Sequence, residues 1–396
     1  MTAPRPPGLE AAAFLTLLGF VAALQVSIAA AGILLTFTVG LWIALLARDG
    51  ERPAGPPFLP PLLAYAAATF VSAAFSLDPG ASLVDSREVL LFVVVPIVHR
   101  LARHERAQTL ATLVVTVGAT TAVWGVVQYG VLEYDHLGRR PDGTMGHYMT
   151  YSGLLVLTIA LAAARVLFDS RRRLWSALVM PALLVALAVT LTRSYWVGAG
   201  AAVAVLCLLK DLRLVAVAPV LAALVLAFAP PQISNRLYSA FDPEDPTVRD
   251  RLAMARAGGR IIRDHPWTGV GPDMVQEVYP RYRDAGAVQD ENPHLHNVPV
   301  QIAAERGLPA LAVWCLFVVA AVRHLFRLLD DEAARPLAAA GLAAVAAMLT
   351  GGLFEYNFGD SEFLMLFLVI LALPQAAALR PAAPPSAATG PDASRG

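Results

Sequence analysis

The chain is divided into long apolar blocks, and this pattern constrains its fold more than any other feature. The blocks are roughly 17 to 25 residues long, and each is sufficient to cross a hydrocarbon core of about 30 Å as a helix. Because 57% of the residues are hydrophobic and only 15% are charged, a soluble core could not bury this much apolar surface. We therefore predict an all-α integral membrane protein, a bundle of about 12 transmembrane helices with one large, partly helical periplasmic loop.

The boundaries of the apolar blocks give the predicted membrane spans. These lie near residues 10–26, 28–47, 57–76, 86–102, 108–131, 148–168, 174–192, 194–209, 213–229, 308–326, 336–355 and 361–379. The first block has no small-residue cleavage site after it, so we interpret it as a retained helix and not as a removed signal peptide. Cys207 and Cys315 both fall inside predicted spans, which excludes a disulfide in an exported loop.

Basic residues indicate which ends of the spans face the cytoplasm. Arginines, with Lys210, concentrate in alternate connections between the spans, and cytoplasmic loops hold the excess of Lys and Arg. This parity predicts that both termini are cytoplasmic and that one long loop is exported. The predicted domains are a membrane domain with helices 1–9 (residues 1–229), the large periplasmic loop (230–307), a membrane domain with helices 10–12 (308–380) and a disordered cytoplasmic tail (381–396).

The first half of the long loop is a predicted amphipathic helix with several arginines. Residues 247–263 have helical periodicity, and their predicted apolar side consists of Leu252, Ala255, Gly259 and Ile262. The other sides carry Arg249, Arg256, Arg260 and Arg263. The helix stops at His265-Pro266, and Gly269 and Gly271 make a tight turn. An alternative interpretation is a basic surface helix that lies on anionic lipid headgroups.

The second half of the loop ends in a histidine-containing segment. Asn297 is a predicted N-cap of a short helix that Gly307 ends, so His296 should lie at a helix N-terminus near the outer membrane face. A neutral imidazole in that position can take a proton from a hydroxyl. His294 and His296 also form a His-x-His pair, but no third and fourth metal ligand follows at a recognisable spacing, so we predict no metal site. Both histidines could instead be ordinary surface residues of the loop.

A further candidate is Arg193, which lies at the outer junction of two apolar runs with almost no loop between them. An arginine so close to the hydrocarbon is costly unless it faces a cavity or an anion, although its guanidinium could also reach the headgroups. Tyr195 and Trp196 already supply interfacial anchoring. Arginines above a membrane face can hold phosphate oxygens through bidentate, charge-assisted hydrogen bonds. A lipid diphosphate is therefore a candidate ligand.

These motifs together resemble the O-antigen ligase and O-antigen polymerase superfamily of bacterial envelope glycan enzymes. His296-Asn297, followed nine residues later by Gly307, is similar to the family's His-Asn-x9-Gly pattern, although Ala310 stands where the family often has Gly, Thr or Tyr. Residues 251–271 resemble its segment of an arginine, an amphipathic helix and Pro-x-x-Gly-x-Gly. Thr192-Arg193-Ser194 and the segment that begins at Arg140 resemble two further family motifs.

The resemblance implies a metal-independent glycosyltransferase of the bacterial inner membrane that uses no cofactor. It would move a glycan from undecaprenyl diphosphate to an acceptor hydroxyl, on lipid A core or a similar molecule, in lipopolysaccharide or surface polysaccharide biosynthesis. By this analogy Arg193 and Arg251 hold the diphosphate, and His296 activates the acceptor. The predicted substrate-binding residues are Arg140, Arg260, His294 and Asn297, and the predicted structural glycines are Gly269, Gly271 and Gly307.

Several related functions remain open at this point. A polymerase of lipid-linked glycans, or a protein O-oligosaccharyltransferase, would use the same donor and differ in the acceptor. A transporter of lipid-linked sugars is a different class, and it should carry polar groups along a path through the bilayer. The predicted spans are nearly free of charge and the polar residues collect at the outer face, which favours an enzyme. The expected partners are the lipid-linked donor, a lipid- or glycan-bearing acceptor and membrane lipids, with no nucleic acid.

Overall fold

The fold is taken from a computed structural model of the chain, which describes residues 8–216, 231–239, 242, 244–284 and 286–379. The regular structure of these residues is helical apart from one isolated bridge between His136 and Arg139. The helices of the bundle are α1 (Gly8–Ala23), α2 (Ile28–Asp49), α3 (Leu59–Ala74), α5 (Val94–Leu101), α6 (Glu105–Gly130), α7 (Tyr148–Phe168), α8 (Arg173–Val189), α9 (Arg193–Lys210), α14 (Val298–Leu328), α15 (Arg335–Gly351) and α16 (Ser361–Ala378). The other helices are α4 (Pro79–Asp85), η1 (Ser86–Val93), α11 (Pro231–Tyr238), α12 (Pro246–Asp264), α13 (Val275–Tyr282) and η3 (Asn357–Gly359).

The length and composition of these helices agree with a membrane protein. Among the described residues, five helices are long and apolar enough to cross a bilayer, namely α2, α6, α7, α14 and α16. The apolar helices α1, α3, α8 and α15 are shorter. The predicted all-helical, apolar architecture is therefore confirmed, whereas the number of crossings stays a prediction. Most of the predicted span 213–229, and the predicted tail 381–396, lie outside the described residues.

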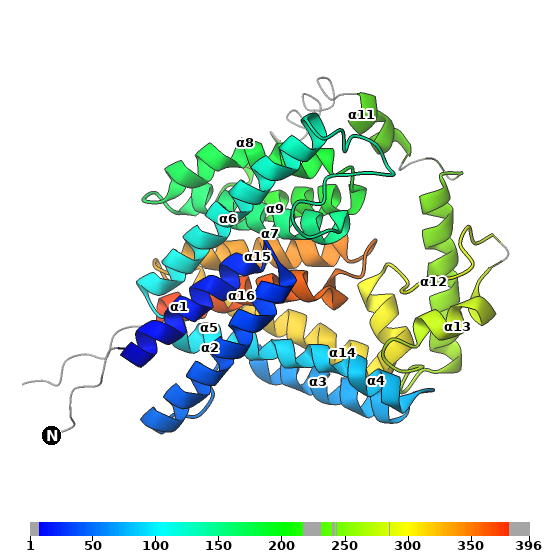
Figure 1. Cartoon of the computed structure of the whole chain (residues 1–396), viewed down its shortest axis with the longest axis horizontal. Coiled ribbons are helices and arrows are strands. Elements are labelled where there is room, and N and C mark those ends of the chain that lie inside the picture. Colours follow the sequence, from blue (N-terminus) through cyan, green and yellow to red (C-terminus); the bar gives the residue numbers. More distant parts are fainter. Residues whose placement is uncertain (1–7, 217–230, 240–241, 243, 285, 380–396) are drawn as a thin grey trace, which may run out of the picture.

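The helices are arranged around a central group formed by α7, α15 and α16 (Figure 1). Helices α7 and α16 are largely buried. In the 18-residue apolar stretch of each, 78% of the residues are buried, compared with 22% for α2. Helices α6, α8 and α9 lie on one side of this group, and α3 and α14 lie on the other (Figure 1). The elements α4, α11, α12 and α13 gather at one end of the bundle (Figure 1). The loop that we predicted to be exported therefore covers a single end of the helices.

Two predicted helices differ from expectation. The span near 86–102 is not one α-helix, because a 3₁₀ helix, η1, runs directly into α5. Pro96 lies in the first turn of α5, and its missing N–H is tolerated only near a helix start. Helix α12 forms as predicted, but the predicted buried face is wrong. The apolar residues that are buried are Ala253, Met254, Ala257, Gly258 and Ile261. Leu252, on the predicted face, is 51% exposed.

The small residues of α12 explain why this face is buried. A side chain at Gly258 would overlap Val300 at the start of α14, and the nearby Leu295 as well. The glycine therefore lets the backbones of α12 and α14 approach closely, and the neighbouring Ala257 and Ile261 enter the same apolar cluster. The close approach to α14 at Gly258 therefore fixes which side of α12 is buried.

Candidate active site

The tight turn after α12 is held against a break in α14. Val270 N donates to Ala304 O, Gly271 N to Glu305 O and Leu308 N to Pro266 O. This close approach depends on glycine, because a Cβ at Gly307 would overlap the Trp267 carbonyl and a Cβ at Gly269 would overlap the Glu305 backbone. Gly307 has φ 81° and ψ 167°, so the helix that begins at Val298 is interrupted there, as predicted.

The substitution Gly307→Ala should destabilise the folded protein. An L-residue at φ 81° and ψ 167°, a region that essentially only glycine occupies, costs about 1–3 kcal/mol, and the overlap with Trp267 adds to that cost. The midpoint of thermal unfolding in detergent should fall by a few degrees or more. Gly259→Ala is the matched control, since Gly259 is exposed within α12 with open space around it, and alanine there should be neutral or stabilising by up to about 1 kcal/mol. Equal melting of both variants would contradict this role of Gly307.

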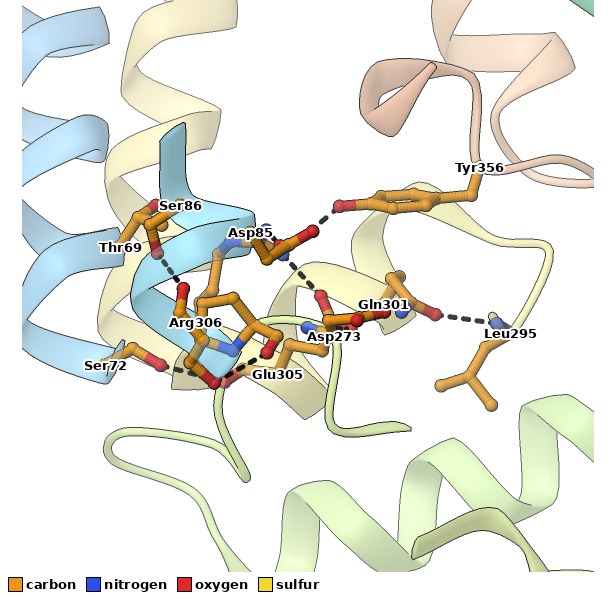
Figure 2. Close-up of polar contacts among 12 residues, drawn as sticks. Thr69, Ser72, Asp85, Ser86, Asp273, Leu295, Gln301, Glu305, Arg306 and Tyr356 are labelled. Carbon is orange, nitrogen blue, oxygen red and sulfur yellow. Dashed lines mark hydrogen bonds and ion pairs between the residues drawn. The ribbon is translucent and has the colours of Figure 1, made fainter. Parts of the chain in front are cut away.

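A buried ionic cluster fixes the same turn to the membrane helices. Arg306 Nη1 donates to Glu305 Oε2 at 2.6 Å and to the Tyr356 hydroxyl at 3.2 Å, and its Nη2 lies 3.7 Å from Asp85 Oδ2 (Figure 2). Ser72 of α3 donates to the Thr268 carbonyl at 2.7 Å. Removing one partner of a buried pair typically costs about 3–5 kcal/mol. The cluster therefore holds Tyr356, and with it the segment before α16, in a fixed position.

The segment that carries His296 is docked on the connection between α15 and α16. Asn297 is the N-cap of α14, as predicted, because its side chain accepts from Val300 N. Its Nδ2 donates to Leu353 O at 3.0 Å, and Val298 N donates to Gly352 O at 2.7 Å. His296 itself has φ 47°, a left-handed conformation that is uncommon for a residue other than glycine. The contacts of its neighbours maintain this strained conformation.

Both histidines of the His-x-His pair contact one buried carboxylate. His296 Nδ1 lies 2.9 Å and His294 Nε2 lies 3.3 Å from Glu355 Oε1, and their ring centroids are 4.2 Å apart. Burial works to raise the pKa of Glu355, but the hydrogen bonds that it accepts from the two histidines outweigh this effect and hold the pKa below its ordinary value. A carboxylate only accepts, so His296 Nδ1 is the donor. In the neutral ring the lone pair of His296 is then on Nε2, the arrangement that a general base requires.

A second group of charges surrounds Arg193 at the start of α9. Its Nη1 donates to Ser239 Oγ at 2.9 Å, and its Nη2 lies 3.3 Å from Asp245 Oδ1. Arg236 Nη1 lies 3.8 Å from Asp245 Oδ2, so the Asp245 carboxylate pairs with the guanidinium groups of both Arg193 and Arg236. Burial and, after it, the charge of Arg193 lower the pKa of Arg236 to about 10.

Arg251 and Arg140 complete this arginine cluster, which consists of Arg140, Arg193, Arg236 and Arg251. Both residues lower the pKa of Arg236 through their charges, and Arg251 is also within electrostatic range of Glu355. Arg251 makes no hydrogen bond or ion pair with any described residue. The Arg140 guanidinium lies over the Tyr148 ring, 3.4 Å from its centroid. Four cations with little compensating negative charge form a strong site for an anion.

The structure thus brings most of the predicted site residues together and leaves one apart. Arg260 is directed away from the cluster, because its Nε donates to Tyr282 O at 3.0 Å and its Nη1 pairs with Asp284 at 2.9 Å. These contacts join α12 to the end of α13. Arg260 therefore stabilises the loop and does not join the arginine cluster.

A comparison with known protein families agrees with this geometry. Residues 178–315, about a third of the chain, match the family described as O-antigen ligase. This match supports a relation of the segment to the O-antigen ligase superfamily. The matched segment contains Arg193, Arg251 and His296, whereas Arg140 and Glu355 lie outside it. No curated protein sequence matches the chain.

Three residues of this candidate site were not recognised in the sequence. Glu355 ends an apolar block, and an acidic residue in that position is costly enough to indicate a function. Arg236 and Asp245 lie in the poorly patterned first part of the long loop, where nothing distinguishes them from solvated charges. Only the fold brings them to Arg193.

The histidine pair also has a potential third metal ligand, Glu355. One atom each of His294, His296 and Glu355 lie within 4.8 Å of one another, a donor set that suits zinc or a similar ion. The argument from spacing overlooked Glu355 because 59 residues separate it from His296. Hydrogen bonds to Glu355 account for the arrangement without an ion, so metal independence stays a prediction.

Proposed function

We propose that the protein is a glycosyltransferase that moves a glycan from undecaprenyl diphosphate to an acceptor hydroxyl at the periplasmic face of the bacterial inner membrane. The observation that carries the proposal is the arginine cluster beside a histidine oriented by a buried carboxylate. In this proposal the chain crosses the membrane about 12 times, with both termini in the cytoplasm. The end of the bundle covered by α11, α12 and α13 then faces the periplasm.

The arginine cluster would hold the diphosphate of the donor. A diphosphate carries several negative charges, and guanidinium groups match its oxygens in bidentate geometry. Asp245 compensates only part of the positive charge, and Arg251 keeps all its hydrogen-bond donors available. As the bond between the sugar and the diphosphate breaks, negative charge develops on the leaving oxygen, and the preorganised cations stabilise it.

His296 would act on the acceptor. Its Nε2 removes the proton of the acceptor hydroxyl as that oxygen forms a bond to the anomeric carbon of the donor sugar. The bond from this carbon to the diphosphate oxygen breaks in the same step, and undecaprenyl diphosphate leaves with the electron pair. Glu355 keeps the proton on Nδ1 and stabilises the positive charge that His296 acquires. The proton is later released to solvent.

Ligation to lipid A core or a similar acceptor is our preferred reaction. A polymerase and a protein O-oligosaccharyltransferase share the donor chemistry, so they are the alternatives within the superfamily. The experiment that separates them is an envelope glycan profile from cells that lack the protein, together with an assay of lipid-linked intermediates. Loss of glycan from its final acceptor, with full-length polymer still on the lipid, is the result expected for a ligase.

Other results of this experiment would change the assignment. Accumulation of single repeat units on the lipid would indicate a polymerase, and loss of glycan from protein alone would indicate an oligosaccharyltransferase. If the protein were a transporter, cells without it would keep the lipid-linked glycan on the cytoplasmic side, where periplasmic hydrolases do not reach it. Complementation with the wild type should restore the profile, and a normal profile without the protein would refute all of these functions.

A further inference from the structure

A groove of about 260 Å³ lies toward the end of α14 that is farthest from the histidine pair. Pro57, just before α3, forms one side, and residues of α14 between Leu316 and Arg327 form the other. The two helices lie side by side (Figure 1). Phe58 packs edge-to-face on Phe317 with ring centroids 6.0 Å apart, which fixes the two sides of the groove relative to each other. The proposed glycan transfer does not use this region.

Helix geometry places the groove opposite the candidate active site across the membrane. Gly307 interrupts α14 beside the turn after α12, and Arg327 follows about 20 residues later, which corresponds to roughly 30 Å along a helix. This is about the thickness of the hydrocarbon core. Since the break lies at the periplasmic boundary in the proposed orientation, Arg323 and Arg327 lie at the cytoplasmic boundary.

The part of the groove that is nearer to the membrane centre is apolar and faces outward. Leu316 and Val319 are 60% and 52% exposed, and they line the groove together with Ala320. From Leu316 to Arg327 the helix rises roughly 16 Å, about half the thickness of the hydrocarbon core. This wall therefore has the length of the acyl region of a single leaflet.

Two arginines without protein partners lie at the polar end of the groove. Arg323 and Arg327 are four residues apart, so their side chains share one face of α14. Both are exposed, and neither makes a hydrogen bond or an ion pair with another described residue. In contrast, Arg172 pairs with Glu105 at 2.7 Å. No acidic residue is among the described residues that line the groove, so its positive charge is uncompensated.

We propose that this groove binds an anionic phospholipid of the cytoplasmic leaflet. The phosphodiester lies between Arg323 and Arg327, and an acyl chain runs along Leu316 and Val319. Guanidinium groups form charge-assisted hydrogen bonds with phosphate oxygens, and basic pockets between transmembrane helices on this side of a membrane bind anionic headgroups. A zwitterionic phospholipid offers the same chains without the net negative charge, so it should bind more weakly. The bound lipid contacts both α3 and α14 and therefore stabilises the folded protein.

A lipid titration of the purified full chain tests the proposal without glycan transfer. Delipidated protein in detergent is titrated with dioleoyl phosphatidylglycerol or dioleoyl phosphatidylcholine, and native mass spectrometry measures the bound fraction. Phosphatidylglycerol should bind at least tenfold more tightly and should raise the midpoint of thermal unfolding. Glycerol 3-phosphate at the same concentrations should not displace it, because it has no acyl chain. Equal binding of the two lipids, or displacement by glycerol 3-phosphate, would overturn the proposal.

Three variants locate the site. The double variant Arg323→Gln/Arg327→Gln should lower the affinity for phosphatidylglycerol by about 10- to 30-fold. Val319→Trp fills the apolar wall and should weaken binding while both arginines remain. Arg171→Gln/Arg173→Gln is the matched control, since it removes two exposed arginines near the start of α8 and should keep the wild-type affinity. Unchanged affinity in the first variant, or an equal loss in the control, would show a general attraction to basic surface and refute the site.

Discussion

Replacing His296 with asparagine should lower the rate of glycan transfer by about 10²- to 10⁴-fold, the usual contribution of a positioned general base. Asparagine is the informative replacement because it tolerates the left-handed φ of 47° better than alanine does. The backbone of the segment, with its contacts to the connection between α15 and α16, should therefore survive. The measurement is the initial rate of transfer by purified protein from a lipid-linked glycan donor.

The control for this variant is the same change at another histidine of the loop. His265 is the C-cap of α12, and the ion pairs of Glu355 are with His294 and His296, so His265→Asn should retain the wild-type rate. Donor binding should be unchanged in both variants, because the arginine cluster is intact. If folded His296→Asn protein transferred glycan at the wild-type rate, His296 would not be the base.

The sequence predicted the architecture well because lipid imposes a simple rule on it. A helix is the only structure that satisfies every backbone polar group of a single crossing segment, so apolar block length leads directly to helices. Local signals were equally dependable at Asn297 and Gly307. Capping and a helix break depend on nearby backbone groups, and both residues have the predicted conformation.

The prediction of the site was incomplete for a different reason. Arg193, Arg251 and His296 were identified through motifs, but their partners Asp245 and Glu355 are distant in sequence. No local pattern indicates which acidic residue will pair with a given base, since the pairing follows from how helices pack. The wrong face of α12 has the same origin. Close packing at Gly258 places the face with Met254 and Ile261 against α14.

Replacing Arg251 with lysine should reduce transfer by about 10²- to 10³-fold, the loss typical of removing one group that stabilises developing charge. Lysine keeps the positive charge, so the general attraction for the donor should persist. It lacks the planar fork of donors that binds two phosphate oxygens at once. Arg251 has no other hydrogen bond or ion pair among the described residues, so the substitution should leave the folded structure almost unchanged.

Arg260→Lys is the matched control, because Arg260 lies on the same helix, about two and a half turns further on, and pairs with Tyr282 and Asp284. That variant should lose some thermal stability and keep its transfer rate, the reverse of the result for Arg251→Lys. The comparison separates a guanidinium that holds the donor from one that holds the loop. Equal loss of transfer in both variants would mean that the helix contributes a general basic surface, and that the assignment of the diphosphate site to Arg251 is wrong.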